Sequence, residues 1–171
     1  MKTLNWKHTD WSARNFIFSI GQEIVGQLTF YSAWNYNAVY TDKETKLTFV
    51  QKSAWNRNVV IKREGETIGE IDFQFFGNQT LKLASGACFT LSTNAWGRNV
   101  QWKASDGQTV VKYQQATLSS MGKGVISLAD SLALDTEKLL ICSGLFVRQL
   151  IHKRVALTVA ILVPIIAASS R

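Results

Sequence analysis

Eight lysine and arginine side chains are the residues of this chain whose types and spacing point most directly to chemistry. Ammonium and guanidinium groups bind phosphate and carboxylate oxygens through charge-assisted hydrogen bonds. The alternative is that these charges only keep an exposed surface soluble. The candidate lipid- or anion-binding residues are Lys52, Arg57, Lys62, Arg63, Arg98, Lys103, Lys153 and Arg154.

The charge balance supports a search for an anionic partner. The chain has a formal net charge of +7 and a sequence pI near 9.6. Residues 1–63 carry nine Lys and Arg against four acids, and residues 139–171 carry four basic residues and no acid. Such a field favours membrane surfaces rich in anionic lipid head groups, or nucleic acid.

Groups for catalysis are hard to find in this sequence. The two histidines, His8 and His152, are far apart along the chain, and there is no Gly-x-Ser-x-Gly motif, Walker loop or metal-spaced Cys/His set. Each of these would be needed for a recognisable nucleophile, phosphate cradle or metal centre. We therefore expect a non-enzymatic protein with no cofactor, in which His152 is an interfacial or capping side chain.

A short repeat sets the scaffold that must position the basic residues. Its lead aromatic residues are 21, 21 and 20 positions apart, and a period in this range indicates one supersecondary unit used repeatedly. Within each unit, two runs of alternating apolar residues flank a turn such as Glu64-Gly65 or Asp106-Gly107, which predicts a β-hairpin. We expect the lead aromatics to fill the core or cap a barrel rim; they are Trp34, Trp55, Phe76 and Trp96.

Counting outward from these units gives about twelve strands between Thr3 and Leu128, including an earlier pair over residues 12–20 and 23–30. A chain of 171 residues with 46% hydrophobic content can bury one sizeable core. Cys88 and Cys142 form no disulfide framework, which favours a reducing compartment. The start of the chain lacks the apolar core of a signal peptide, so we expect a location in the cytoplasm or on the cytoplasmic face of a membrane.

The sequence changes character after Leu128. Residues 139–151 are apolar on nearly every side, and a helix of that kind must be enclosed by protein or lipid. At about 20 Å it is short for a bilayer but long enough to thread a small barrel. Asp135 is interpreted as the N-cap, with Glu137 in the first turn, where acidic groups meet the helix dipole favourably.

Residues 132–146, Leu-Ala-Leu-Asp-Thr-Glu-Lys-Leu-Leu-Ile-Cys-Ser-Gly-Leu-Phe, resemble a segment of the Tubby-like group, which includes the phospholipid scramblases and the LURP-one-related proteins. The likeness extends through the strand repeat over residues 1–152. It implies a mainly β fold: a closed antiparallel barrel of about twelve strands around a central hydrophobic C-terminal helix. It also implies association with membranes and lipid head groups.

The scramblase resemblance further implies a calcium segment before the helix, here residues 129–137. Only Asp130, Asp135 and Glu137 supply acidic oxygens, whereas a calcium loop needs six to eight oxygen ligands with acids at alternating positions. We expect no metal site in this segment.

A second apolar run departs from a minimal barrel of this type. Residues 155–168 carry no charge, follow Lys153 and Arg154, and are predicted to form, with the rest of residues 153–171, a tail that anchors the barrel to a membrane. The alternative is a tail buried on the barrel or in a subunit contact. Three functions follow: a lipid- or head-group-binding barrel, an accessory subunit anchored in a larger membrane complex, and a nucleic-acid-binding module with tryptophans as stacking platforms.

Overall fold

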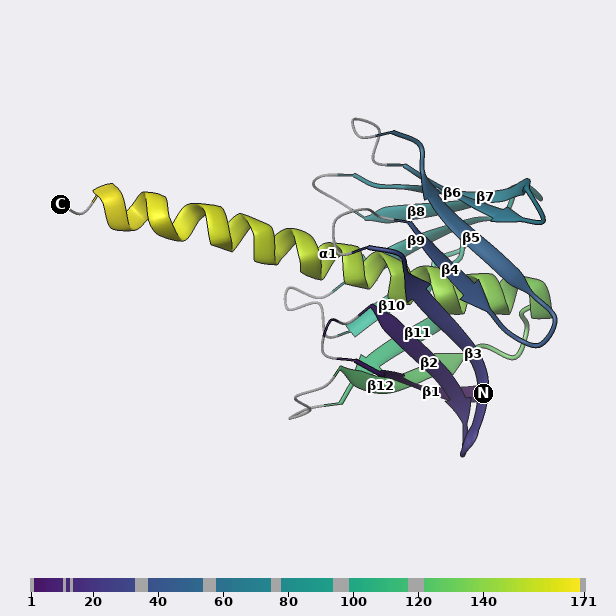
Figure 1. The fold of residues 1–171 in the computed structure, drawn as a ribbon. Helices are drawn as coiled ribbons and strands as arrows, with labels where there is room; N and C mark the ends of the chain where they lie inside the picture. Colours follow the sequence, from purple (N-terminus) through teal and green to yellow (C-terminus); the bar gives the residue numbers. More distant parts are fainter. Residues whose placement is uncertain are drawn as a thin grey trace.

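The structure is a computed structural model that describes residues 2–10, 12, 14–32, 37–53, 58–74, 78–93, 99–116 and 122–169. The side chains of residue 99 and of residues 153–169 are outside that description. Within these residues the chain forms twelve strands and one helix (Figure 1). The strands are β1 (Lys2–His8), β2 (Asn15–Ile20), β3 (Glu23–Phe30), β4 (Ala38–Thr41), β5 (Lys46–Gln51), β6 (Val59–Arg63), β7 (Glu66–Asp72), β8 (Gln79–Leu83), β9 (Cys88–Thr93), β10 (Asn99–Lys103), β11 (Thr109–Gln115) and β12 (Lys123–Leu128), and the helix is α1 (Leu134–Ser169).

The strands close into an antiparallel barrel, which confirms the fold that the resemblance implies. Each strand pairs with its neighbours along the chain, and β12 pairs with β1 to complete the ring. Closure removes the free edges that an open sheet would expose to other chains. Along β1 one face is buried: Leu4 and Trp6 point inward, whereas Asn5 between them is exposed, which is the alternation expected of a half-buried strand.

Tight turns with residues of positive φ join the strands of the hairpins. Glu64 and Gly65 both have positive φ, 51° and 90°, the combination that a type I′ turn requires and that matches the twist of the flanking strands. The predicted turn at Asp106-Gly107 joins β10 to β11, with Gly107 at φ 83°. The hairpin prediction is therefore confirmed here by both pairing and turn geometry.

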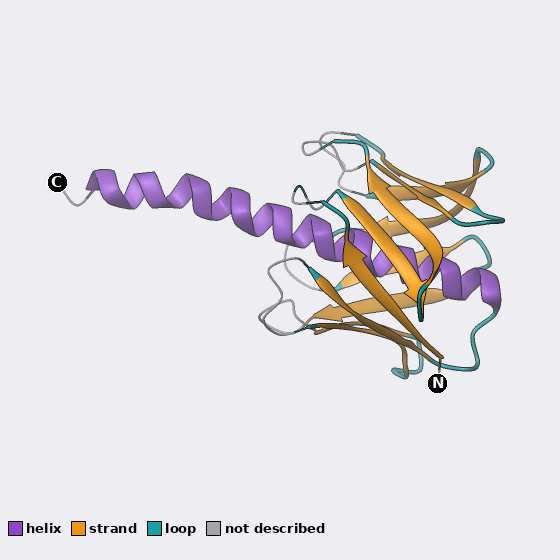
Figure 2. Cartoon of the chain, turned by 60° about the horizontal axis from the view of Figure 1, so that its bottom comes forward, coloured by secondary structure: helices purple, strands orange, loops and turns teal. Residues whose placement is uncertain are grey.

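Helix α1 runs through the interior of the barrel (Figure 2). Every residue from 139 to 150 is buried, and a helix can be buried on all sides only if it is enclosed. The Phe146 ring stacks against Phe49 and Phe30 of the barrel wall, with ring centroids 4.5 Å and 5.4 Å apart. The prediction of an enclosed apolar helix is confirmed.

Two strand side chains set the depth and rotation of the helix. Tyr113 Oη donates to the carbonyl oxygen of Leu140 at 2.5 Å, and Trp102 Nε1 donates to the same oxygen at 3.2 Å. Gly144, one turn further along, leaves room for the tyrosine ring: a Cβ there would lie 2.2 Å from Tyr113 Cζ. These contacts admit one register of the helix inside the barrel.

The start of α1 corrects one detail of the sequence interpretation. The helix begins at Leu134, and the N–H of Glu137 donates to the carbonyl oxygen of Ala133, so Ala133 takes the cap position. Asp135 lies inside the first turn instead of at the N-cap. Its carboxylate accepts a hydrogen bond from Arg63 at 3.0 Å, and this ion pair across the barrel rim replaces the predicted local bond to the backbone.

Beyond residue 152 the helix continues without interruption to Ser169 and leaves the barrel at the end opposite to its start (Figures 1 and 2). We call the barrel end beside Leu134 the start rim and the end that the helix leaves the exit rim. Among the residues whose side chains are described, no helix is long and apolar enough to cross a membrane. The repeat aromatics Trp34, Trp55, Phe76 and Trp96 lie outside the described residues, so their predicted positions stay predictions.

Candidate functional site

The candidate cations that the structure describes do not gather in one patch. Lys52 follows β5 at the exit rim, whereas Arg63 ends β6 at the start rim. Lys62 and Lys103 lie near the start rim on β6 and β10, separated by β7, β8 and β9. The remaining candidates are outside the described part: Arg57 and Arg98 altogether, and Lys153 and Arg154 in their side chains.

Two of the predicted cations are already paired with acids. Lys52 Nζ contacts both carboxylate oxygens of Glu70 at 2.8 Å. The hydrogen bonds from Lys52 and Asn58 lower the pKa of Glu70. Arg63 binds Asp135, and that hydrogen bond lowers the pKa of the Asp135 carboxyl. A cation held by a carboxylate has less charge to offer an external anion.

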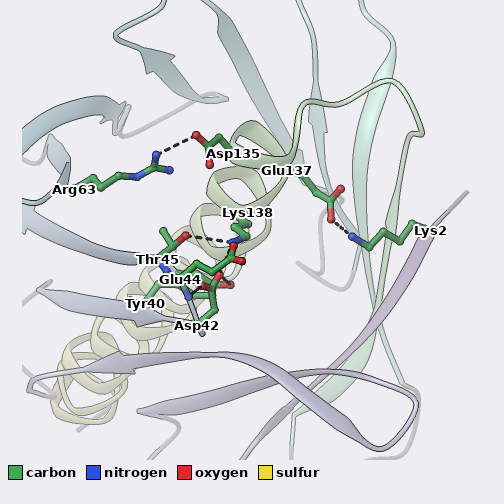
Figure 3. A network of polar contacts seen from close by, with 9 residues as sticks. All are labelled: Lys2, Tyr40, Asp42, Glu44, Thr45, Arg63, Asp135, Glu137 and Lys138. Atoms are coloured by element: carbon green, nitrogen blue, oxygen red, sulfur yellow. Dashed lines mark hydrogen bonds and ion pairs between the residues drawn. The ribbon is translucent and has the colours of Figure 1, made fainter.

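At the start rim, charged residues of the first helical turns reach three different parts of the barrel (Figure 3). Asp135 meets Arg63 at the end of β6. Glu137 accepts from Lys2 of β1 at 2.6 Å. Lys138 lies 3.2 Å from carboxylate oxygens of Asp42 and Glu44 in the β4–β5 connection. Together these contacts tie the beginning of α1 to both sides of the barrel opening.

Asp42 is the best supported acid of this rim, with a side chain that is 5% exposed. Burial alone would raise the pKa of its carboxyl. Hydrogen bonds from the backbone N–H groups of Glu44 and Thr45, and from Lys138 and Tyr40, outweigh burial and lower this pKa. Asp42 therefore stays ionised and holds Lys138 in place.

The exit rim contains a buried cation that the sequence-based search did not select. Arg148 of α1 is 5% exposed. Its guanidinium carbon Cζ lies over the Trp6 ring, 4.8 Å from the ring centre, and Nη2 donates to Gln115 Oε1 at 2.5 Å. Burial lowers the pKa of Arg148 to about 10, so the group remains charged at neutral pH.

The two histidines, distant in sequence, come close to this arginine. The His8 ring lies 5.9 Å from the Trp6 ring, centre to centre. Burial lowers the pKa of His8, and the positive charge of Arg148 lowers it further, whereas Asp10 acts in the opposite direction. Burial of the ring, followed by the charge of Arg148, lowers the pKa of His152, even though much of this residue is exposed.

Arg148 was not predicted from the sequence because it lies inside an apolar run and does not belong to a cluster of basic residues. Its neighbours come from β1 and β11, more than thirty positions away. A signal was nevertheless present: residues 139–152 contain one charged residue, and a charge in an enclosed helix needs a partner or a function.

The described residues contain no group of three or more His, Cys, Asp or Glu side chains that could hold a metal ion. Buried Cys142 has a strongly raised pKa because burial disfavours its thiolate, and it is therefore a poor nucleophile. Comparisons with family models, with curated proteins and with solved structures gave no match to this chain.

Proposed function

We propose that this protein is a non-enzymatic, membrane-associated barrel that binds anionic lipid head groups, with the exit rim turned toward the membrane. The observation that carries the proposal is the path of α1, which fills the barrel and then continues beyond the exit rim. The proposal includes membership of the Tubby-like and scramblase-related group and a position on the cytoplasmic face.

The first argument is the sequence of the projecting part of the helix. Residues 155–168 carry no charge, and the barrel interior is already filled by residues 139–150. From residue 153 to Ser169 the helix extends for about 25 Å. An apolar surface of this size drives association with lipid or protein, and burying it gains about 0.8 kcal/mol per CH₂ group.

The second argument is the position of charge along the same helix. Lys153 and Arg154 stand between the barrel and the apolar run. If the run enters the membrane, this pair lies at the level of the head groups, where basic residues are favoured by anionic lipids at about 1 kcal/mol each. The net charge of +7 acts in the same direction over a longer range.

The test is flotation of purified protein with vesicles of phosphatidylcholine and phosphatidylserine. The full chain should float, and a chain lacking residues 155–171 should stay in the lower fraction as a folded barrel. Leu157→Glu combined with Ile161→Glu should also abolish flotation. The matched control, Ile20→Glu with Ile24→Glu, changes two exposed residues of the β2–β3 hairpin at the start rim and should float like the wild type.

Flotation of the truncated chain, or failure of the full chain to bind any vesicle, would overturn the proposal. In the second case, retention of the full chain in native membranes together with other proteins would favour the accessory-subunit alternative, in which the projecting helix packs on a partner.

A further inference from the structure

Arg148 is a buried cation without an anion. The chain has twelve Asp and Glu residues, and all twelve lie in the part that the structure describes. None of them forms an ion pair with Arg148, and burial is the cause of its lowered pKa. An isolated buried charge is strongly unfavourable, and neither the amide of Gln115 nor the ring of Trp6 supplies a negative charge.

Two more polar nitrogens beside Arg148 lack partners. Trp6 Nε1 and His8 Nε2 are buried and make no hydrogen bond with the described residues. Both lie against glycines near the start of β12: a Cβ on Gly124 would be 2.8 Å from Trp6 Nε1, and one on Gly122 would be 2.9 Å from His8 Nε2. Buried polar atoms without partners are rare in native proteins, and an unseen water or ion is one of the explanations that they call for.

Asp10, the acid whose charge acts on His8, is hydrogen-bonded to other residues. Asp10 accepts hydrogen bonds from Ser12 at 2.6 Å, from the Arg14 N–H at 3.3 Å and from Asn15 at 2.5 Å. These bonds hold it within the connection between β1 and β2. The exit rim therefore presents a guanidinium without an ion-pair partner and two unpartnered ring nitrogens, while Asp10 acts on His8 through its charge and makes no ion pair with Arg148.

We propose that Arg148, with Trp6 and His8, forms an oxyanion site at the exit rim that takes a phosphate group. A guanidinium binds phosphate oxygens through parallel charge-assisted hydrogen bonds, and the indole N–H is a donor without an acceptor of its own. The phosphate comes either from a lipid head group or from a free phosphorylated molecule. The site does not depend on the membrane attachment proposed above, because it lies within the barrel wall and the enclosed part of α1.

The first experiment titrates inorganic phosphate into the full chain in nonionic detergent at constant ionic strength. The NMR signals of the Trp6 indole N–H and the His8 ring should shift and saturate, and the melting temperature should rise with phosphate. Arg148→Met should weaken this binding by roughly tenfold or more. Lys43→Met removes one positive charge at the opposite rim, from an exposed lysine outside the candidate set, and should bind phosphate like the wild type.

Stability without phosphate separates a binding role from a structural one. Removing an unpaired buried charge should leave the melting temperature of Arg148→Met unchanged or higher in phosphate-free buffer. If that variant does not fold, Arg148→Lys provides the test: it keeps the charge, loses the planar fork and should bind phosphate more weakly than the wild type. A phosphate response that is equal in wild type and in either folded variant would overturn the inference.

The second experiment identifies the source of the phosphate. Vesicles of phosphatidylcholine with and without phosphatidic acid are compared in flotation of wild type and Arg148→Met. Loss of the preference for phosphatidic acid in the variant indicates a lipid head group, and an unchanged preference together with lost binding of inorganic phosphate indicates a free ligand. Absence of saturable phosphate binding in a chain that still floats would refute only this site, whereas phosphate binding without flotation would refute only the attachment.

Discussion

The charged residues of α1 are paired with opposite charges at one rim of the barrel and unpaired at the other. At the start rim, Asp135, Glu137 and Lys138 each meet an opposite charge on the barrel. At the exit rim, Arg148 is more deeply buried than these residues and has no acidic partner among the described residues. The more exposed charges of the helix, which need a partner least, are thus paired, whereas the buried charge, which needs one most, has no acidic partner.

This difference separates two roles of the helix. Ion pairs on several sides of the start rim fix where α1 begins, and the bonds from Tyr113 and Trp102 to the Leu140 carbonyl fix its rotation. Because these contacts already fix the position of α1, Arg148 at the exit rim can remain without an acidic partner until a ligand supplies the negative charge. Unsatisfied groups tolerated at one place and compensated elsewhere are typical of binding sites.

The largest effect is expected midway between the rims. Leu145 is fully buried, and Leu145→Asp would place a carboxylate in the interior without a partner. We expect a loss of several kcal/mol, enough to unfold a domain of ordinary stability. Leu145→Met keeps the volume and should cost less than about 1.5 kcal/mol. Urea unfolding of both variants measures the difference.

These two variants measure how much an unpaired buried charge destabilises this barrel. A wild-type melting temperature for Leu145→Asp would mean that the barrel interior tolerates unpaired charge. The lack of an acid beside Arg148 would then need no ligand to explain it.

A smaller loss is expected where the helix is keyed to the wall. Gly144→Ala would place a methyl group 2.2 Å from Tyr113 Cζ, so the ring must move and its bond to Leu140 must lengthen. Overpacking and a weakened buried hydrogen bond together should cost about 2 to 4 kcal/mol. In a Tyr113→Leu background the same substitution should cost less, and a double-mutant cycle measures that coupling. Additive losses would show that Tyr113 does not set the register.

The sequence predicted the barrel well because its signals are local. Alternating strands and Gly-containing turns repeat along the chain, and the all-apolar segment could only be an enclosed helix or a membrane helix. Its short length favoured the first, which the structure bears out. The strands and hairpins therefore follow from periodicity and turn chemistry, whereas closure of the barrel around the helix was what the family resemblance implied.

The sites were harder because they depend on pairing across the barrel. No periodicity indicates that Arg63 meets Asp135, 72 positions later, or that His8 and Arg148 share one rim. The predicted basic residues were chosen for their charge alone, and charge does not show whether a carboxylate lies opposite. The binding role of all eight candidates, including the paired Lys52 and Arg63, stays a prediction.

The next effect in size contrasts one substitution type at both rims. Lys138→Met should destabilise the protein by about 1 to 2 kcal/mol because it leaves the buried Asp42 carboxylate without its cation, whereas Arg148→Met should be neutral or stabilising. Lys43→Met is the control, since its ion pair with Glu23 is exposed and should contribute less to stability than the pair of Lys138 with Asp42. Thermal melts of the three variants under identical low-phosphate conditions measure the order. Destabilisation by Arg148→Met equal to that by Lys138→Met would remove the distinction between the rims.

The smallest effect separates the rims by pH. The pKa values of His8 and His152 are lowered from 6.5, first by burial and then by Arg148. As the pH falls below about 6.5, these histidines take up protons in the unfolded chain, while in the folded chain they are still neutral. The free energy of unfolding is therefore highest above this pH and decreases as the pH falls below it. At the start rim the lowered pKa of Asp42 has the same sign but acts only below about pH 4, where the unfolded carboxyl becomes protonated.

Urea unfolding between about pH 7 and pH 5 should therefore report on the exit rim alone. The loss in this range should shrink in His8→Gln, and also in Arg148→Met, which removes the repelling charge. Asp10, which raises the pKa of His8, is unchanged in both variants. A loss that persists in full when both histidines are replaced by glutamine would place the titrating group elsewhere and would separate the histidines from the Arg148 site.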